Sequence, residues 1–137
     1  MRALAQELGD RCAWLVVYVA EAHATDEWPI SSARFNGSRG AVHLAQTRTT
    51  RARADSARAF ARDFELEGLG ALAVDAPEEG EPFDAAFAPW PVRFYVLQQN
   101  GATQGAVVRF VSSPHNEGFI ELAAFRRALL HAAAAEI

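Results

Sequence analysis

The chain has 137 residues with a net charge of −4, and half of its residues are apolar. This length fits one domain with a real hydrophobic core, and the acidic balance argues against a nucleic-acid partner, which would usually require a basic surface. Its single cysteine, Cys12, excludes an internal disulfide and a CxxC redox or zinc motif within the chain. No apolar run approaches the ~20 residues that cross a membrane, and Gln6 and Glu7 interrupt the start, unlike a signal peptide. We therefore expect a cytoplasmic protein with no membrane partner.

The first elements along the chain are predicted to be a helix, a strand and a long loop. The helix covers residues 2–9, with Leu4 and Leu8 on one face and Gly9 at its end. A strand follows at about 13–20, because residues 14–19 are an apolar run rich in β-branched and aromatic side chains. Residues 24–47 are expected to form a loop, and loops of this length tend to be functional.

The second half is predicted to contain two helices and three strands. A helix at about 50–65 carries an apolar stripe, and a short strand at 71–74 ends at Asp75. Residues 94–97 and 105–111 are expected to pair as a hairpin, since Asn100-Gly101 is a strong turn signal. An amphipathic helix at about 118–135 closes the chain. The segment around Pro77, Gly80 and Pro82 is expected to be a loop.

This order of elements indicates a single α/β domain over residues 1–137. A parallel crossover followed by an antiparallel hairpin and a covering helix matches the second half of a thioredoxin-like domain. We therefore expect a three-layer α/β/α arrangement around a mixed sheet, incomplete at its N-terminal side.

The best site candidates follow the first strand, because open α/β sheets place ligand sites at the carboxyl ends of their strands. His23 could position or protonate a substrate near neutral pH, and Glu21 could orient it, since residues two apart on an extended chain point to the same side. The alternatives are a histidine that caps loop backbone groups and a solvated strand-end acid.

Two further residues extend this candidate site. Asp26 either contacts a substrate or caps the loop backbone, and Trp28 either stacks on an aromatic ligand or anchors the loop. A metal site made of Glu21, His23 and Asp26 is a weak alternative, because a fourth ligand and helical spacing are both missing. We expect no metal and no cofactor.

Three segments of the chain resemble the iodothyronine deiodinase family. Residues 15–28, LVVYVAEAHATDEW, are similar to that family's apolar strand running into Glu-Ala-His, a small linker, Asp and Trp. Residues 46–58, which contain Gln46-Thr47-Arg48-Thr49 and Arg53, resemble the segment leading into the following helix. Residues 90–97, which contain Arg93, resemble a strand after an aromatic-rich loop. The three segments keep the family's order along most of the chain.

The resemblance implies a thioredoxin-type fold and a reductive dehalogenation. A selenolate or thiolate at a helix N-terminus would remove iodine from an iodinated phenol ring, and a thiol reductant would restore it. His23 would bind the substrate or donate a proton, Glu21 would orient His23, and Trp28 and Asp26 would line the pocket. Arg53 and Arg93 are the further substrate-binding candidates, with structural ion pairs as the alternative for both.

The chain departs from the family pattern at three places. The nucleophile position would lie upstream of Met1, and Cys12 follows the first helix instead of starting it. Thr47 stands where vertebrate members carry a second histidine, and Ser112-Ser113-Pro114 replaces a double-glycine turn and an arginine. We therefore expect a truncated domain of a selenoprotein family that is inactive by itself. The DNA before Met1, followed through any in-frame UGA codon, tests this expectation.

The alternative function is a non-catalytic binding or assembly module, a pseudoenzyme that reuses the fold. In the thioredoxin arrangement the absent strand would lie between the first strand and the strand near 93–98. Its loss would leave backbone edges unpaired, and unpaired edges invite another chain. The partner would then be a second copy, joined through exposed strand edges, instead of an aromatic or halogenated small molecule.

Overall fold

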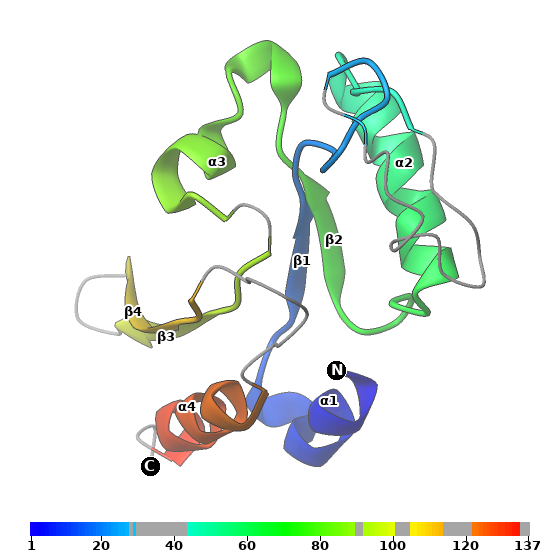
Figure 1. Ribbon diagram of the computed structural model, residues 1–137. Coiled ribbons are helices and arrows are strands. Elements are labelled where there is room, and N and C mark those ends of the chain that lie inside the picture. The colour runs from blue at the N-terminus through cyan, green and yellow to red at the C-terminus, as the bar shows by residue number, and fades with distance from the viewer. Residues whose placement is uncertain (28, 30–43, 90–91, 101–104, 114–121, 135–137) are drawn as a thin grey trace. The chain divides into compact units, whose positions relative to one another are not determined.

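The computed structural model describes residues 1–27, 29, 44–89, 92–100, 105–113 and 122–134. They form a mixed α/β protein, which confirms the expected class (Figure 1). In chain order the elements are α1 (Arg2–Leu8), η1 (Gly9–Arg11), β1 (Leu15–Tyr18), α2 (Thr50–Asp63), β2 (Ala71–Val74), η3 (Pro77–Glu79), α3 (Pro82–Phe87), β3 (Tyr95–Asn100), β4 (Gly105–Val111) and α4 (Leu122–Ala134).

The chain divides into two compact units. Unit 1 contains residues 1–15, 68–71 and 87–137, and unit 2 contains residues 16–67 and 72–86. The strands form two separate two-stranded sheets, β1–β2 and β3–β4, where the sequence had led us to expect one mixed sheet. None of the helices in the described ranges has both the length and the apolar character needed to cross a bilayer.

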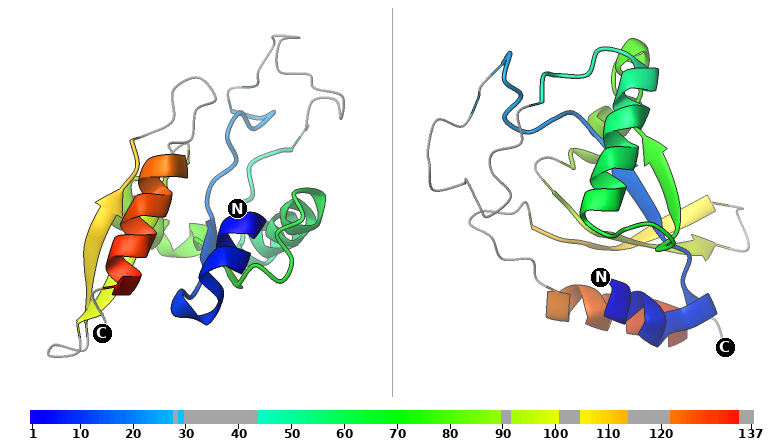
Figure 2. Two further views of the ribbon diagram at one scale, coloured as in Figure 1. Left: turned by 90° about the horizontal axis from the view of Figure 1, so that it is seen from below. Right: turned by 90° about the vertical axis from the view of Figure 1, so that its right-hand side faces the viewer.

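Unit 1 is built on a helix–hairpin core. Helix α4 lies along one face of the β3–β4 hairpin, as the views of Figure 2 show. Phe125 of α4 is 4% exposed, and its ring contacts those of Trp14, Phe94 and Phe110. The other buried members of this core come from α1, β3 and α4, and they are Leu4, Leu8, Val96, Leu129 and Ala132. Leu4 and Leu8, predicted to share one face of the helix, are both buried, and the predicted end of the helix at Gly9 is confirmed.

The predicted hairpin is also confirmed, although its turn at residues 101–104 lies outside the described residues. The strands pair antiparallel, with Val96 opposite Phe110 and Leu97 opposite Val108. The register shifts between Val96 and Leu97, as at a β-bulge, which bends a strand and changes its twist. Three apolar side chains of the hairpin remain at least 44% exposed, namely Leu97, Val108 and Val111.

Strands β1 and β2 form a parallel pair joined by a helical crossover, and most of both strands belongs to unit 2. Ala71 donates its backbone N–H to Trp14 O and Asp75 donates to Tyr18 O, both at 2.9 Å, so the partner numbers rise together along both strands. Parallel neighbours require such a crossover, here through α2 (Figure 1). Thr49 caps α2, because its hydroxyl accepts the N–H of Ala52 at 3.1 Å.

The sequence analysis missed helix α3, which occupies part of an expected loop. Pro82 opens the helix, at a position where its missing N–H is harmless. The carboxylate of Asp75 accepts the N–H groups of Phe83 and Asp84, both at 2.8 Å. The capping group therefore lies seven residues before Pro82, and a search for local capping patterns cannot find it.

Candidate functional site

Two loop segments of unit 2, one after β1 and one before α2, run beside each other. Thr25 donates its backbone N–H to Leu44 O at 2.8 Å. The side chain of Gln46 bonds both backbone polar groups of one residue in the first segment: Glu21 N donates to Gln46 Oε1 at 3.0 Å, and Gln46 Nε2 donates to Glu21 O at 3.3 Å. The backbone N–H of Gln46 is donated to Asp26 Oδ1 at 2.8 Å. Gln46 thus joins the two candidate acids, Glu21 and Asp26.

The side chain of Glu21 is held from the strand that precedes it. Tyr18, the last residue of β1, donates its hydroxyl to Glu21 Oε1 at 2.5 Å. The ring of Tyr18 packs against that of Phe60 in α2, with centroids 5.4 Å apart. Burial raises the pKa of the Tyr18 phenol above its usual range, and the hydrogen bond to Glu21 raises it further. Tyr18 therefore remains a donor throughout the neutral range.

This raised pKa predicts a loss of stability in alkali. The folded state keeps the Tyr18 proton where the unfolded chain releases it, so the free energy of unfolding should fall as pH rises above about 10. The chain contains no lysine, which leaves the two tyrosines and Cys12 as the side chains that titrate there. Urea denaturation between pH 8 and 11.5 measures the slope. Tyr18→Phe should flatten it more than Tyr95→Phe, and equal slopes for both variants would contradict the assignment.

His23 lies in a turn and not on an extended strand. Strand β1 ends at Tyr18, and His23 has a φ of 60°, in the left-handed region that few non-glycine residues adopt. The expectation that alternation puts Glu21 and His23 on one side is therefore wrong, because the chain has already turned. His23 is half-buried, and a left-handed residue of this kind carries a backbone strain of about 1–3 kcal/mol. Such strain concentrates at functional sites, so His23 remains a candidate.

Asp26 and Glu27 form a surface network with Arg48. The guanidinium Nη2 of Arg48 lies 3.0 Å from Glu27 Oε1 and 3.6 Å from Asp26 Oδ2. The backbone N–H of Gln46 holds the pKa of Asp26 below its usual range, and Arg48 adds to this effect. Asp26 was predicted either to contact a substrate or to cap the loop backbone. Its carboxylate accepts the backbone N–H of Gln46, which is the contact expected of a residue that caps the loop backbone.

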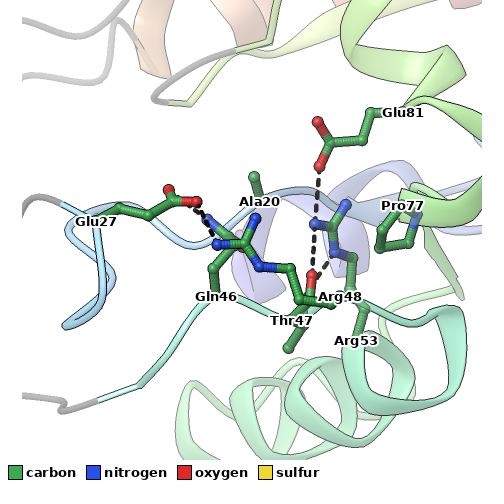
Figure 3. Close-up of a pocket in the computed structure, with 8 residues that line it drawn as sticks. All are labelled: Ala20, Glu27, Gln46, Thr47, Arg48, Arg53, Pro77 and Glu81. Atoms are coloured by element: carbon green, nitrogen blue, oxygen red, sulfur yellow. Dashed lines mark hydrogen bonds and ion pairs between the residues drawn. The ribbon is translucent and has the colours of Figure 1, made fainter.

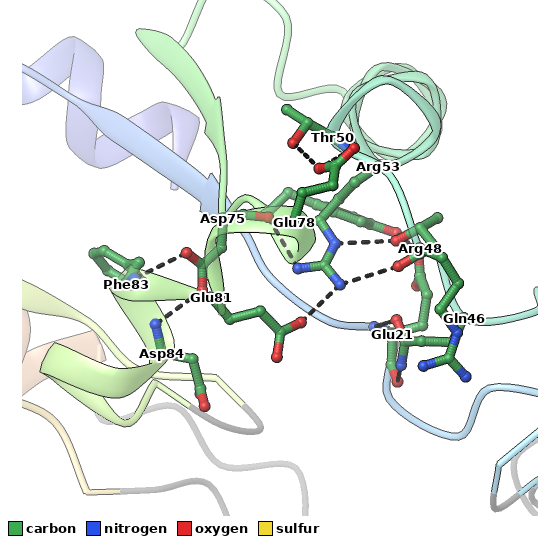
Figure 4. A network of polar contacts seen from close by, with 12 residues as sticks. Glu21, Gln46, Arg48, Thr50, Arg53, Asp75, Glu78, Glu81, Phe83 and Asp84 are labelled. Atoms are coloured by element: carbon green, nitrogen blue, oxygen red, sulfur yellow. Dashed lines mark hydrogen bonds and ion pairs between the residues drawn. The ribbon is translucent and has the colours of Figure 1, made fainter.

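Arg53 is a buried connector within unit 2. Its side chain is 1% exposed and bonds three residues that lie in separate segments of the unit (Figure 4). Nε donates to Thr47 Oγ1 at 3.0 Å, Nη1 donates to Asp75 O at 2.9 Å, and Nη2 donates to Glu81 Oε1 at 2.8 Å. A further bond from Nη2 reaches Thr47 O at 3.3 Å. Arg53 was predicted either to bind substrate or to form a structural ion pair. Its contacts, including the ion pair with Glu81, favour the structural role.

A polar pocket of about 280 Å³ opens beside these contacts and lies wholly in unit 2 (Figure 3). Two arginines and two glutamates face it, already joined as the pairs Arg53–Glu81 and Arg48–Glu27. The described residues that line it are Ala20, Glu27, Gln46, Thr47, Arg48, Arg53, Pro77 and Glu81. A site with both donors and acceptors suits a small polar group, and its paired charges leave it close to neutral.

Glu21, His23 and Asp26 are not among the described residues that line this pocket, and the remaining candidates lie elsewhere. Trp28 lies outside the described residues. Arg93 belongs to unit 1, where its Nε atom is buried and has no hydrogen-bond partner among the described residues. Cys12 also belongs to unit 1 and packs, half-buried, against the apolar core. Within the described ranges, no group of three or more His, Cys, Asp or Glu side chains is arranged to hold a metal ion.

Sequence reasoning overlooked three residues that organise the site. Tyr18 was treated only as part of an apolar strand, Gln46 only as part of a matched segment, and Asp75 only as the end of a strand. Their roles depend on partners up to 25 residues away in the sequence, and no local pattern marks such pairs. The sequence offered one signal for these three residues, which is their position. Tyr18 and Asp75 lie at strand ends, and Gln46 lies near the end of the predicted loop.

Comparisons of the chain with models of known protein families, with curated proteins and with solved structures found no match.

Proposed function

We propose that the chain is a deiodinase-like domain of thioredoxin type, whose site in unit 2 binds a small aromatic or halogenated phenol. One observation supports this most: two of the three segments that carry the family resemblance are bonded to each other. Residues 20–26 and 46–53 are separated in the sequence, yet Gln46 contacts both Glu21 and Asp26. They meet where β1 ends, and the ends of parallel strands are where α/β proteins place ligands.

The three-layer thioredoxin arrangement is part of the same proposal. The parallel β1–α2–β2 crossover and the antiparallel β3–β4 hairpin under α4 are the parts that such a fold would contribute. A reducing, cytoplasmic compartment fits a chain with one cysteine and no internal disulfide.

The proposed reaction is the reduction of an aryl iodide by thiols. A thiolate or selenolate attacks iodine, the carbon–iodine bond breaks, and the ring carbon takes a proton. A second thiol then displaces iodide from the chalcogen and forms a disulfide or selenosulfide, so two thiols are oxidised for each iodide released. His23 is our candidate for binding the phenol or donating the proton, with Glu21 fixed next to it in the sequence.

The nucleophile for this step is not assigned to any of the 137 residues. Cys12 is the only thiol, and it lies after α1 and before β1, half-buried against the core of unit 1. A reactive thiolate is favoured by exposure and by a helix N-terminus, whereas Cys12 is half-buried and follows the C-terminal end of η1. The proposal for this chain is therefore binding without turnover.

The absence of turnover is directly measurable. Incubating the chain with 4-iodophenol and dithiothreitol should release no iodide above the rate of the same mixture without protein. Cys12→Ser should behave identically. Iodide release by the chain that disappears in Cys12→Ser would contradict the proposal, because it would make Cys12 the nucleophile.

Binding itself is expected to depend on His23. Replacing His23 by glutamine should weaken the binding of 4-iodophenol about tenfold, the effect of losing one hydrogen bond of about 1–1.5 kcal/mol. Isothermal titration calorimetry measures it. His23→Gly is the folding control, since glycine adopts a φ of 60° without strain and should preserve or raise stability while also weakening binding. Unchanged affinity in both variants would remove His23 from the site.

A second function, self-assembly through strand edges, is favoured by the two separate sheets. No further strand of the described residues extends either two-stranded sheet, and Leu97, Val108 and Val111 of the hairpin are exposed. An exposed apolar strand edge pairs readily with another chain. Sedimentation equilibrium distinguishes the functions: a dimer that dissociates in Val108→Lys supports assembly, whereas a monomer at all concentrations favours the ligand-binding domain.

A further inference from the structure

Two guanidinium groups lie between two glutamates in the polar pocket of unit 2 (Figure 3). Arg48 Nη2 donates to Glu27 Oε1 at 3.0 Å, and Arg53 Nη2 donates to Glu81 Oε1 at 2.8 Å. Each arginine is therefore oriented by a carboxylate from another segment of the chain. A guanidinium carries five N–H groups in one plane, so a carboxylate that holds one of them leaves the others in defined directions.

The donors that remain in the pocket outnumber the acceptors. Only Nη2 of Arg48 contacts acceptors among the described residues, which leaves its Nε and Nη1 groups. Thr47 Oγ1 accepts the Nε–H of Arg53, and the hydroxyl hydrogen of Thr47 has no acceptor in the described part of the chain. Both carboxylate oxygens of Glu27 are already bonded, so of the two lining glutamates only Glu81 keeps an oxygen, Oε2, without a described partner.

The pocket is built partly from a buried and fixed positive charge. Arg53 is 1% exposed, and its four hydrogen bonds to Thr47, Asp75 and Glu81 fix its position. Arg48, in contrast, is 67% exposed and open to a ligand from solvent. An anion in this pocket meets both charges, and a charge away from water acts more strongly. The volume of about 280 Å³ is near the lower end of ligand pockets, so the ligand is small.

These observations define the chemical class of the ligand. Free donors on arginine and threonine suit an oxyanion, and the planar guanidinium matches a carboxylate in particular. A dianion is disfavoured, because the pocket also carries the negative charges of Glu27 and Glu81. Only Ala20 and Pro77 of the described lining residues are apolar, so a short acid fits better than an aromatic ring.

We propose that this pocket binds a small monocarboxylate, whose oxygens accept hydrogen bonds from the free N–H groups of Arg48 and the hydroxyl of Thr47, while Arg53 supplies a second positive charge. His23, the candidate for phenol binding, is not among the described residues that line the pocket. The inference therefore goes beyond the proposed function and does not depend on it.

The first test titrates ¹⁵N-labelled chain with sodium acetate at constant ionic strength. The backbone amides of residues 46–48 and the Nε–H signal of Arg48 should shift and saturate. Sulfate should bind about tenfold more weakly than acetate, because its second charge faces the two glutamates of the pocket. Shifts that do not saturate with acetate, or sulfate binding as tight as acetate binding, would overturn the inference.

The second test compares two arginines close together in the sequence. Arg48→Gln should weaken acetate binding about tenfold, since it removes the charge-assisted hydrogen bonds of the free N–H groups. Arg51→Gln is the matched control, because Arg51 is an exposed arginine that is not among the described lining residues, and its affinity should stay within about twofold of the wild type. Equal losses in both variants would show a response to net charge alone, which overturns the inference.

Two further variants assign the hydroxyl and separate the two sites. Thr47→Val should weaken acetate binding about fivefold, whereas Thr47→Ser keeps the donor and should bind like the wild type. A serine variant as weak as the valine variant would overturn the role of the hydroxyl. His23→Gln, which is expected to weaken phenol binding, should leave acetate affinity unchanged. An equal loss of both ligands in His23→Gln would place them in one site and overturn the inference, whereas acetate binding without phenol binding would contradict only the proposed function.

Discussion

Replacing Arg53 by methionine is expected to lower the free energy of unfolding by about 3–5 kcal/mol, the cost of removing one partner from a buried charge network. The guanidinium is 1% exposed and bonds Thr47, Asp75 and Glu81. Methionine keeps an unbranched apolar side chain but none of the donors of arginine. The carbonyl oxygens of Thr47 and Asp75 would lose their Arg53 donors, and the carboxylate of Glu81 would lose its ion-pair partner. Urea denaturation followed by circular dichroism measures the change.

Two further variants sharpen this prediction. Arg53→Lys keeps the charge but offers a single ammonium in place of a planar fork, so it should recover less than half of the loss. Arg58→Ala, on the same helix, removes an exposed ion pair with Asp55 and should change stability by less than about 0.5 kcal/mol. An Arg53→Met chain as stable as Arg58→Ala would show that the network does not hold unit 2 together.

Phe125→Ala is expected to destabilise unit 1 by about 3–5 kcal/mol, the usual cost of removing a buried phenylalanine ring. The ring is 4% exposed and contacts three other aromatic rings, those of Trp14, Phe94 and Phe110. Deleting it removes apolar contacts and leaves a cavity among large side chains that cannot close completely. Thermal unfolding followed by tryptophan fluorescence reports the change, since Trp14 lies against the altered site.

The control for Phe125 lies one turn earlier on the same helix. Leu122 is 46% exposed, and Leu122→Ala should therefore cost well under 1.5 kcal/mol while making the same kind of truncation. If the two variants were equally stable, Phe125 would not be the centre of the apolar core of unit 1.

Much of the fold was predictable because it is encoded locally. The α1 stripe of Leu4 and Leu8, the strand at 71–74 and the alternating strands of the hairpin each carry their own periodicity. Helix α2 begins at Thr50, the predicted start, directly after its capping residue Thr49. In these elements the side chains that decide the structure lie within a few residues of each other.

The missed features depend on contacts between segments that are far apart in the sequence. Helix α3 is capped by Asp75 from the end of β2, and the site is organised by Gln46, 25 residues from Glu21. The sequence analysis identified Glu21, His23 and Asp26 from residue type and strand position, but it assumed an extended chain after Tyr18. The turn at His23 alters the direction of every side chain that follows it.

Burial of charge was the least predictable property. Arg53 and the exposed arginines of α2 look alike in the sequence, yet only Arg53 among the described arginines is buried. Its partner residues lie in three separate segments: Thr47 in the loop before α2, Asp75 directly after β2, and Glu81 directly before α3. Only a structure that brings these segments together distinguishes a buried connector from a solvated surface charge.

The most direct test of the proposed site is a titration of ¹⁵N-labelled chain with 4-iodophenol, followed in ¹H–¹⁵N correlation spectra. We predict saturable shifts at the amides of residues 20–27 and 44–48, and their loss in Gln46→Ala but not in Gln99→Ala. Shifts that do not saturate, or that are confined to the exposed apolar side chains of the β3–β4 hairpin, would contradict a phenol-binding site in unit 2.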